Sequence, residues 1–164
     1  MINFKNKKIL VTGATGGIGK ALVQKFVSLE GNVLATGTKT EKLDALKKEF
    51  PSINVLKFDI SDHSKIEEFI ENVSSQLVGL DILVNNAGIN KDNLSLRMKD
   101  DEWKKVIDLN LGSTFFLCKY GIKKMLKNKY GRIVNVTSVV GHTGNLGQSN
   151  YAASKAGIVG MSKS

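Results

Sequence analysis

Two side chains that could transfer a proton lie close to the end of the sequence. Tyr151 and Lys155 stand four residues apart in SNYAASKAGIVG, which has a helical pattern, so they share one helix face. A phenol is a weak acid near neutral pH, and a nearby cation stabilises its charged form. Lys155 would therefore tune Tyr151 for acid–base chemistry, although such a pair also arises by chance on a helix surface. Ser138, thirteen positions before Tyr151, adds a hydroxyl at the end of an apolar run.

Apolar runs rich in β-branched residues alternate with amphipathic segments along the chain. The runs predict five strands, at residues 7–12, 32–37, 53–58, 80–85 and 132–137. Strands that are apolar on both faces and alternate with helices form parallel sheets through right-handed crossovers. The sequence therefore predicts an α/β fold, a Rossmann-like doubly wound parallel sheet, with no repeat and no linker.

The clearest helical pattern covers residues 61–77. One stripe at helical spacing comprises Ile66, Phe69, Ile70, Val73 and Leu77. Ser61 or Asp62 is the predicted N-cap of this helix. Gly31 and Gly79 lie where predicted helices end.

The segment TGATGGIGKALV follows the first predicted strand and opens a helix. Glycines at such a junction allow a sharp turn, and the free N–H groups of the helix can then bind a phosphate. The spacing is ambiguous, because Gly13, Gly17 and Gly19 give TGxxxGxG whereas Gly16 also permits TGxxGxxG. The fourth strand runs into NNAG (85–88), at the edge of the sheet where open α/β folds bind ligands. A nucleotide is the expected ligand, and a purely structural turn is the alternative.

The residues at the end of the second predicted strand indicate which dinucleotide is expected to bind. In dinucleotide-binding folds an acidic residue at this position accepts the ribose 2′-hydroxyl, whereas a base favours a 2′-phosphate. Residues 36–38 (TGT) offer no carboxylate, and Lys39 follows them with a cation. The electrostatics favour NADP over NAD, unless Lys39 is only an exposed lysine in the first turn of a helix.

The net charge and the few cysteine and histidine residues indicate which partners and sites are expected. The formal net charge is +9 at pH 7, but the lysines are scattered and have no aromatic residues between them, which favours a solvated surface or an acidic protein partner over nucleic acid. Cys118, the only cysteine, has the setting of a core residue. His63 and His142 lack the spacing of a metal site and are predicted to lie at the surface. No signal peptide or long apolar span is apparent, so a cytoplasmic location is expected.

Five features together resemble the short-chain dehydrogenase/reductase family. They are TGATGGIG, NNAG, Asn110 in DLNLGS, Ser138, and YAASK, and they are spread over the whole chain in the family's order. The resemblance favours the TGxxxGxG spacing for the glycine turn. It implies an oxidoreductase that transfers a hydride with a nicotinamide dinucleotide.

The resemblance also implies roles for individual residues. Tyr151 would supply the proton, Ser138 would polarise the substrate carbonyl, and Lys155 would also hold the nicotinamide ribose. Asn110 would lie in a helix break and orient a water, and Asp59 would contact the adenine. The implied catalytic set is Asn110, Ser138, Tyr151 and Lys155, and the implied cofactor-binding set is Gly13, Thr15, Gly17, Ile18, Gly19, Thr38, Lys39, Asp59, Asn86, Ala87, Gly88, Tyr151 and Lys155.

Two longer segments narrow the resemblance within the family. NNAGINKDNLSLRMKDDEW and SVVGHTGNLGQSNYAASKAG look like the bacterial reductases of fatty acid biosynthesis that act on 3-oxoacyl thioesters of acyl carrier protein. This implies NADP(H) as the cofactor and acyl carrier protein as the partner. Lys129 in KKMLKNKYGR would contact the acidic carrier protein, unless its charge only complements a helix end.

One departure and two alternatives remain. Reductases of this group often carry an arginine where this chain has Gly16, so the preference for NADP depends more heavily on Thr38 and Lys39. A reductase of acetoacetyl-CoA or of another short-chain ketone would need the same chemistry. A non-catalytic NADP-binding partner subunit would not need the complete catalytic set.

The sequence ends within the predicted helix that carries Tyr151 and Lys155. We expect residues 1–164 to be the N-terminal, dinucleotide-binding part of a single-domain reductase, because the resemblance implies two further strands and a substrate lid. The parent is expected to be an active homotetramer. The isolated chain is expected to be poorly stable and nearly inactive, since the fifth strand would be an unprotected edge.

Overall fold

The computed structural model describes residues 3–164 and contains one parallel sheet. Its strand order is β3-β2-β1-β4-β5, with β1 and β4 side by side near the centre. Each strand lies within a predicted range and is at most two residues shorter at either end. The bounds are β1 (Lys8–Val11), β2 (Asn32–Gly37), β3 (Asn54–Lys57), β4 (Ile82–Asn85) and β5 (Arg132–Asn135). The predicted α/β fold is confirmed.

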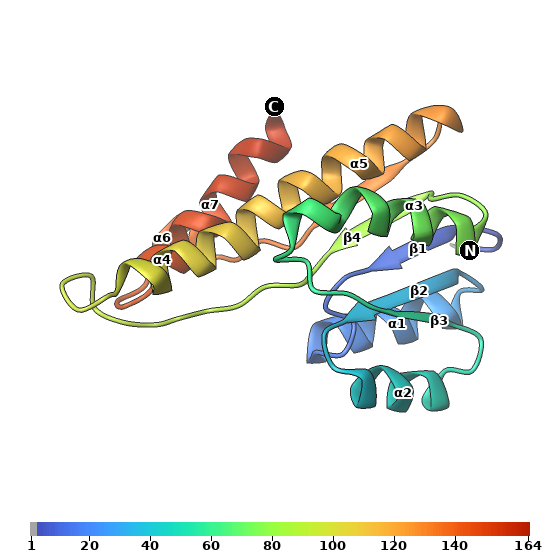
Figure 1. Ribbon diagram of the computed structural model, residues 1–164, viewed down its shortest axis with the longest axis horizontal. Coiled ribbons are helices and arrows are strands. Elements are labelled where there is room, and N and C mark those ends of the chain that lie inside the picture. Colours follow the sequence, from blue (N-terminus) through green and yellow to red (C-terminus); the bar gives the residue numbers. More distant parts are fainter. Residues whose placement is uncertain (1–2) are drawn as a thin grey trace.

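Helices cover both faces of the sheet. Figure 1 shows α1 and α2 on one face and α3 and α5 on the other, while α4, α6 and α7 gather at one end of the sheet. Within residues 3–164, no helix is both long enough and apolar enough to cross a membrane. The helices are α1 (Gly17–Ser28), α2 (Thr40–Glu49), α3 (Ile66–Leu77), α4 (Asp100–Ile107), α5 (Ser113–Lys127), α6 (Val140–Thr143) and α7 (Ser149–Lys163), with a 3₁₀ turn η1 (His63–Lys65) before α3 and a π turn η2 (Asp108–Gly112) between α4 and α5.

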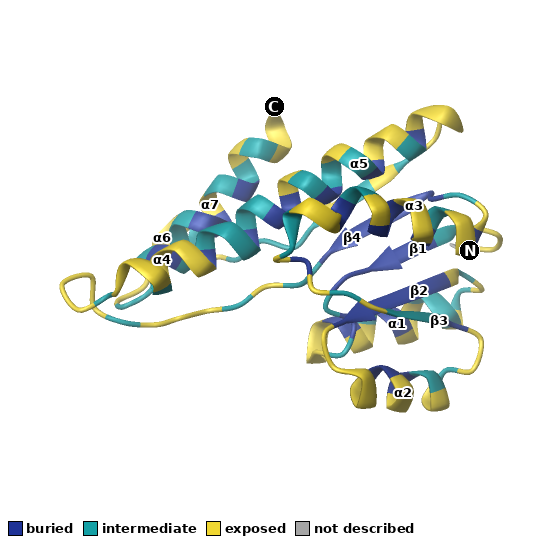
Figure 2. Cartoon of the chain, viewed as in Figure 1, coloured by how far each residue is buried: buried dark blue, intermediate teal, exposed yellow. Residues whose placement is uncertain are grey.

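The central strands contribute to two cores, because successive side chains point to opposite faces of a sheet. On β1, Ile9 and Val11 pack in the cluster that also holds side chains of α1 and α2, whereas Leu10 packs in the cluster with α3 and α5. The predicted apolar stripe of α3 is buried in the second cluster. Figure 2 shows the result, with β1, β2 and β4 buried between helices whose outer faces are exposed, while β3 and β5 at the two edges are less buried.

The start of α3 differs from the prediction. The helix begins at Ile66, after the 3₁₀ turn, and no side chain caps it. The carboxylate of Asp62 instead accepts a hydrogen bond from the hydroxyl of Ser64 at 2.6 Å. Its other oxygen pairs with the ammonium of Lys65 at 2.9 Å, so both oxygens are engaged by side chains of the 3₁₀ turn and none bonds the first N–H groups of α3. The predicted N-cap at Ser61 or Asp62 is therefore wrong.

The two histidines differ in how far they are buried. His142 is exposed, as predicted. His63 is half-buried against α5, with its ring centroid 5.0 Å from that of Phe116, so the prediction of a surface residue is wrong for it. The side chain is held by packing between segments that are distant in sequence.

The glycine turn after β1 is shaped by close packing at two positions. Gly13 has a φ of +61°, and a Cβ there would lie 2.7 Å from the Cα of Ala87. A Cβ on Gly19 would overlap the carbonyl oxygen of Gly13 and lie 2.8 Å from the Cα of Ala14. At Gly17 an added Cβ would meet no atom within 4 Å. Gly13 and Gly19 are thus needed by the fold itself, and Gly17 is not.

Replacing Gly19 or Gly17 by alanine should show which of the two glycines the fold requires. We expect Gly19→Ala to lower the free energy of unfolding by about 1–3 kcal/mol, because the turn must move to admit the methyl group. Gly17→Ala should change it by less than about 0.5 kcal/mol. Urea unfolding followed by circular dichroism measures both, and equal stability of the two variants would contradict this account of the turn.

Candidate active site

The carboxyl ends of four strands surround a pocket of about 420 Å³. This is the edge at which open α/β sheets bind ligands, and β1 and β4 meet there with their connections running to opposite sides. The pocket is lined by the glycine turn, the ends of β2 and β3, and the loop after β4. The lining residues are Gly13, Thr15, Gly16, Gly17, Ile18, Gly19, Thr36, Gly37, Thr38, Phe58, Asp59, Ile60, Asn86, Ala87, Gly88, Ile89 and Leu109. We call it the nucleotide pocket.

A second pocket of about 380 Å³ adjoins the nucleotide pocket, and we call it the reaction pocket. The two share four lining residues. Tyr151 and Lys155 line the reaction pocket from α7, with Gln148 beside them. The shared residues are Ile18, Asn86, Gly88 and Ile89. The predicted proton-transfer pair therefore lies next to the predicted nucleotide-binding residues.

Thr12 joins the glycine turn to the loop after β4. Its side chain is fully buried, and its Oγ1 accepts hydrogen bonds from the backbone N–H groups of Asn86 and Ala87, each at 3.1 Å. The same hydroxyl donates to the carbonyl oxygen of Val84 at 3.2 Å. In return, the side-chain amide of Asn86 donates to the carbonyl oxygens of Thr12 and Gly13, at 3.0 and 3.1 Å. These bonds fix the distance between the two walls of the nucleotide pocket.

Thr12 is absent from the sequence-predicted site. It precedes the glycine turn directly and stands at the end of an apolar strand, where a polar side chain must find a partner once it is buried. That position is the signal from which the residue could have been found. Its partners, more than seventy residues further along the chain, could not be read from the sequence.

Lys155 is almost fully buried, with 4% of its surface exposed. Its ammonium donates a hydrogen bond to the carbonyl oxygen of Val136 at 2.8 Å and lies 5.6 Å from the centroid of the Tyr151 ring. Burial lowers the pKa of Lys155, because the charged form loses solvation. The predicted pairing of cation and phenol on one helix face is present in the structure.

Asn110 lies in the π turn that interrupts the helix between α4 and α5, as the resemblance implied. It is fully buried, its Oδ1 accepts from the N–H of Ile89 at 2.9 Å, and its Nδ2 donates to the carbonyl oxygen of Ile89 at 2.9 Å. The Nδ2 also lies 3.1 Å from the hydroxyl oxygen of Ser154, the neighbour of Lys155. Asn110 stands behind the pocket wall and does not line either pocket.

Ser138 and Asp59 have local partners. The hydroxyl oxygen of Ser138 accepts from the N–H of Val140 at 3.2 Å, which leaves its hydrogen to donate. Ser138 lies between Val136 and Val140, which line the reaction pocket, but is not itself in that lining. Asp59 lines the nucleotide pocket, and its carboxylate accepts from the N–H and hydroxyl of Ser61 at 3.0 and 2.8 Å.

Of the two predicted cofactor-binding residues after β2, only one lines the nucleotide pocket. Thr38 lines the nucleotide pocket, whereas Lys39 is exposed, is the N-cap residue of α2, and is outside the lining. The remaining predicted cofactor-binding residues from the glycine turn and from NNAG lie together in the nucleotide pocket.

Cys118 is half-buried on α5, between β4 and β5. Its sulfur lies 3.3 Å from the Nδ2 of Asn85, and it donates to the Oδ1 of Asn135 at 3.6 Å. Burial raises the pKa of the thiol. The residue is half-buried and belongs to neither core cluster, so the predicted core setting is confirmed only in part.

The residues of the nucleotide pocket fit a dinucleotide. The first turn of α1 carries no acidic side chain, and its backbone N–H groups attract a phosphate. The open space at Gly17 lets a phosphate approach the backbone closely, since an added Cβ there would meet nothing within 4 Å.

The chain belongs to the short-chain dehydrogenase family, because the family model for short chain dehydrogenase matches residues 7–164. It is therefore an oxidoreductase that uses a nicotinamide cofactor. The 3-oxoacyl-[acyl-carrier-protein] reductase FabG of Rickettsia bellii is 46% identical over 164 residues, and the match covers 100% of this chain and 67% of that protein. The FabG proteins of Rickettsia felis and Escherichia coli K12 are 47% and 43% identical, with matches that cover 100% and 99% of this chain and 67% of each relative.

Removing the hydroxyl of Thr12 should loosen both walls of the nucleotide pocket. Thr12→Val keeps the shape but leaves two N–H groups without their acceptor, so we expect a loss of about 1–3 kcal/mol in the free energy of unfolding and weaker binding of nicotinamide dinucleotide. Thr12→Ser keeps the hydroxyl and is the matched control. Urea unfolding and fluorescence titration measure the two effects, and wild-type values for Thr12→Val would contradict the role of the hydroxyl.

Proposed function

We propose that this chain carries the cofactor-binding and catalytic residues of an NADPH-dependent 3-oxoacyl-[acyl-carrier-protein] reductase of fatty acid biosynthesis. The observation that carries the proposal is the position of Tyr151 and Lys155 in a pocket continuous with the nucleotide pocket. The names of the relatives supply the substrate, a 3-oxoacyl thioester of acyl carrier protein.

The roles of the residues follow from the reaction. A bound nicotinamide supplies the hydride that reduces the 3-oxo carbon. Tyr151 gives its phenolic proton to the oxygen of that group, and Ser138 donates a hydrogen bond to the same oxygen. Lys155 holds a positive charge beside the Tyr151 ring and so favours loss of the phenolic proton.

Asn110 acts from behind the wall of the pocket. Its side-chain amide bonds both backbone groups of Ile89, which lines both pockets, and approaches Ser154 beside Lys155. We assign to it the support of this wall and of the proton route that starts at Lys155.

The preference for NADPH over NADH is part of the proposal. The end of β2 presents Thr38 to the nucleotide pocket and has no carboxylate there, so a 2′-phosphate would meet no negative charge at this point. Lys39 follows as the N-cap residue of α2 and supplies a cation directly after Thr38 in the chain. The remaining cofactor contacts come from Gly13, Thr15, Gly17, Ile18, Gly19, Asp59, Asn86, Ala87 and Gly88, which all line the nucleotide pocket.

Acyl carrier protein is the proposed partner, and positive charge near an apolar groove supports this choice. Lys129 and Arg132 line a groove of about 570 Å³ together with Ile122, Leu126 and Tyr130. Leu126 and Lys129 are exposed, and the whole chain has a net charge of +9. An acidic carrier would be attracted by the charge and held by the apolar contact.

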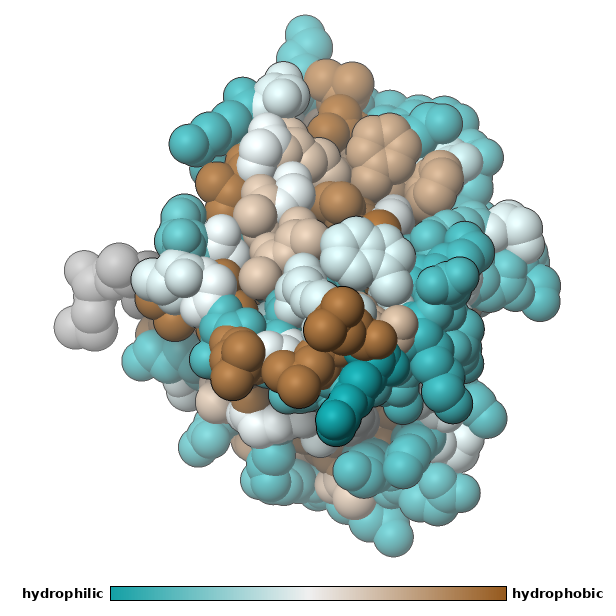
Figure 3. All heavy atoms as spheres, turned by 90° about the vertical axis from the view of Figure 1, so that its left-hand side faces the viewer, coloured by the Kyte–Doolittle hydropathy of each residue, from teal (hydrophilic) through white to brown (hydrophobic). Residues whose placement is uncertain are grey.

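The loops beside the reaction pocket favour an acyl substrate. Figure 3 shows that apolar side chains gather on this end of the molecule, and the exposed ones on its loops include Leu94, Leu96 and Leu146. The N–H of Asn93 donates to the carbonyl oxygen of Gly147 at 2.8 Å, which holds the two loops together. Exposed apolar groups beside a polar pocket suit a ligand with a reactive head and a hydrocarbon chain.

Residues 1–164 are proposed to form one dinucleotide-binding domain, because a single sheet joins the whole described chain. The relatives extend further, since the matches cover 67% of their length. Turnover is therefore best measured on this chain and on a version extended to the length of the relatives.

Tyr151→Phe should abolish reduction without abolishing cofactor binding. We expect the rate of NADPH oxidation with acetoacetyl-acyl carrier protein to fall by roughly 10²–10⁴, because the proton donor is lost while the ring remains. Absorbance of NADPH measures turnover, and fluorescence measures binding. Tyr120→Phe, a change of the same kind outside both pockets, should leave turnover unchanged.

The choice of substrate tests the proposed function itself. A protein that reduces only CoA-linked β-ketoesters would contradict the assignment of acyl carrier protein as the carrier. A protein that binds NADPH but reduces neither carrier-linked nor CoA-linked β-ketoesters would contradict the reductase function.

Thr38→Asp should exchange the cofactor preference. A carboxylate at this position repels a 2′-phosphate and accepts a hydrogen bond from a 2′-hydroxyl, so we expect NADPH to bind about tenfold or more weakly and NADH to bind more tightly. Thr40→Asp adds the same charge at the exposed first residue of α2 and is the control. Titration of each variant with both cofactors measures the effect, and an unchanged ratio of the two affinities would refute the role of Thr38.

A further inference from the structure

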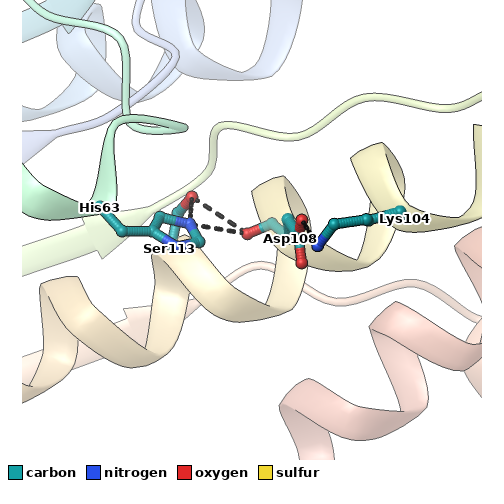
Figure 4. A network of polar contacts seen from close by, with 4 residues as sticks. All are labelled: His63, Lys104, Asp108 and Ser113. Carbon is teal, nitrogen blue, oxygen red and sulfur yellow. Dashed lines mark hydrogen bonds and ion pairs between the residues drawn. The ribbon is translucent and has the colours of Figure 1, made fainter. Parts of the chain in front are cut away.

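His63 reaches the helix interruption that carries Asn110. Its Nε2 lies 3.0 Å from the carbonyl oxygen of Asp108, the first residue of the π turn, and 3.1 Å from the hydroxyl oxygen of Ser113, the first residue of α5 (Figure 4). The same carbonyl accepts the N–H of Ser113, which is the wide bond that defines the turn. A 3₁₀ turn 45 residues away in sequence thus touches both ends of the interruption.

The contacts of the His63 ring show that its Nε2 nitrogen carries a hydrogen. A carbonyl oxygen can only accept, so the contact with Asp108 requires a hydrogen on Nε2. The hydroxyl of Ser113 donates to the carbonyl oxygen of Ile60 at 2.7 Å, which leaves its oxygen to accept from the same Nε2–H. Both contacts are satisfied by one tautomer, in which His63 is a hydrogen-bond donor to the turn.

Packing holds the ring in place. The His63 ring lies against Phe116 on α5 and against the backbone of Gly112, where an added Cβ would be 2.9 Å from Cε1. The lack of a side chain at Gly112 is what admits the imidazole. The hydroxyl of Ser113 also lies 3.3 Å from the carbonyl oxygen of Asp108. The remaining contact to Asp108 in Figure 4 is an ion pair between its carboxylate and Lys104 at 2.7 Å, with the two side chains 46% and 74% exposed. An exposed pair of this kind contributes little.

The turn sets the position of Asn110. π turns are uncommon and give up the regular hydrogen bonding of an α-helix, so they persist where other contacts hold them. The hydroxyl of Thr114 donates to the carbonyl oxygen of Asn110 at 2.6 Å, and the amide of Asn110 holds both backbone groups of Ile89. A change at Asp108 would therefore be passed to the wall shared by the two pockets.

We propose that His63 is a positioning residue: its Nε2–H donates to the carbonyl of Asp108, stabilises the π turn, and so keeps the Asn110 side chain bonded to Ile89. The ring acts through Asn110 and does not touch either pocket. Neither the resemblance nor the chemistry of the site assigns this role.

Amide hydrogen exchange, followed by NMR on the chain without substrate, tests the proposal. The N–H of Ile89 reports the bond to Asn110 directly. His63→Phe keeps a ring but removes the donor, and we expect exchange at Ile89 to rise about tenfold relative to exchange at Leu10 and Leu34 in the core. His63→Gln restores a donor of similar reach without a ring, and exchange should return to within about threefold of wild type.

The control variants show whether His63 acts as a hydrogen-bond donor or only through packing. Lys104→Ala removes the ion pair to the carboxylate of Asp108 and should leave exchange at Ile89 unchanged. Wild-type protection in His63→Phe, or loss of protection in His63→Gln equal to that in His63→Phe, would overturn the proposal, because packing would then explain the residue. Should His63→Phe fail to fold, His63→Met, which has the length of glutamine but no donor, takes its place in the same comparison.

A second readout rests on the proposed function. In the reductase assay, His63→Phe should lower kcat about tenfold while the Kd for NADPH stays within about twofold, and His63→Gln should restore kcat. If the wild-type enzyme reduces no 3-oxoacyl thioester, the proposed function fails, and the exchange at Ile89 still decides whether His63 positions Asn110.

Discussion

The fold and the candidate site meet at the hydroxyl of Thr12. β1 and β4 are paired by backbone hydrogen bonds in the parallel sheet. This pairing ends where β1 leads into the glycine turn and β4 leads into the NNAG loop. Buried N–H groups beyond that point need new acceptors, since leaving them unpaired is costly. One hydroxyl supplies the acceptor for two of them, and the Asn86 side chain returns two bonds to the turn. The width of the nucleotide pocket therefore depends on a short set of polar contacts at the junction of two strands.

Much of this arrangement could be predicted from the sequence, because it depends on local patterns. The apolar runs gave each strand to within two residues, and the stripe from Ile66 to Leu77 identified the buried face of α3. The spacing of Tyr151 and Lys155 placed both on one helix face, and parallel strands bring their carboxyl ends to one edge. Those rules together predicted that Gly13, Asn86 and Lys155 would gather there, and the three residues line the two adjoining pockets.

The features that the sequence did not reveal depend on contacts between distant segments. Thr12 acts on residues more than seventy positions away, and His63 packs against a turn 45 residues away. The predicted N-cap of α3 failed for a different reason, since Asp62 bonds Ser64 within a 3₁₀ turn that the helical pattern does not distinguish from the helix. The glycine spacing was ambiguous between Gly16 and Gly17, and an added Cβ would be crowded at neither position. The steric contact at Gly19, which belongs to both spacings, identifies a glycine that the fold requires.

The burial of Lys155 has a thermodynamic consequence for the folding of the whole chain. Its pKa is lowered in the folded chain, so the unfolded chain binds the proton more tightly in the alkaline range below the ordinary lysine value of 10.5. Within that range the linkage makes the folded state more stable as pH rises, and at neutral pH the charged amine is held at a cost in folding free energy. The hydrogen bond to Val136 offsets part of this cost. The folded chain is thus less stable than it would be without a buried ammonium beside the phenol of Tyr151.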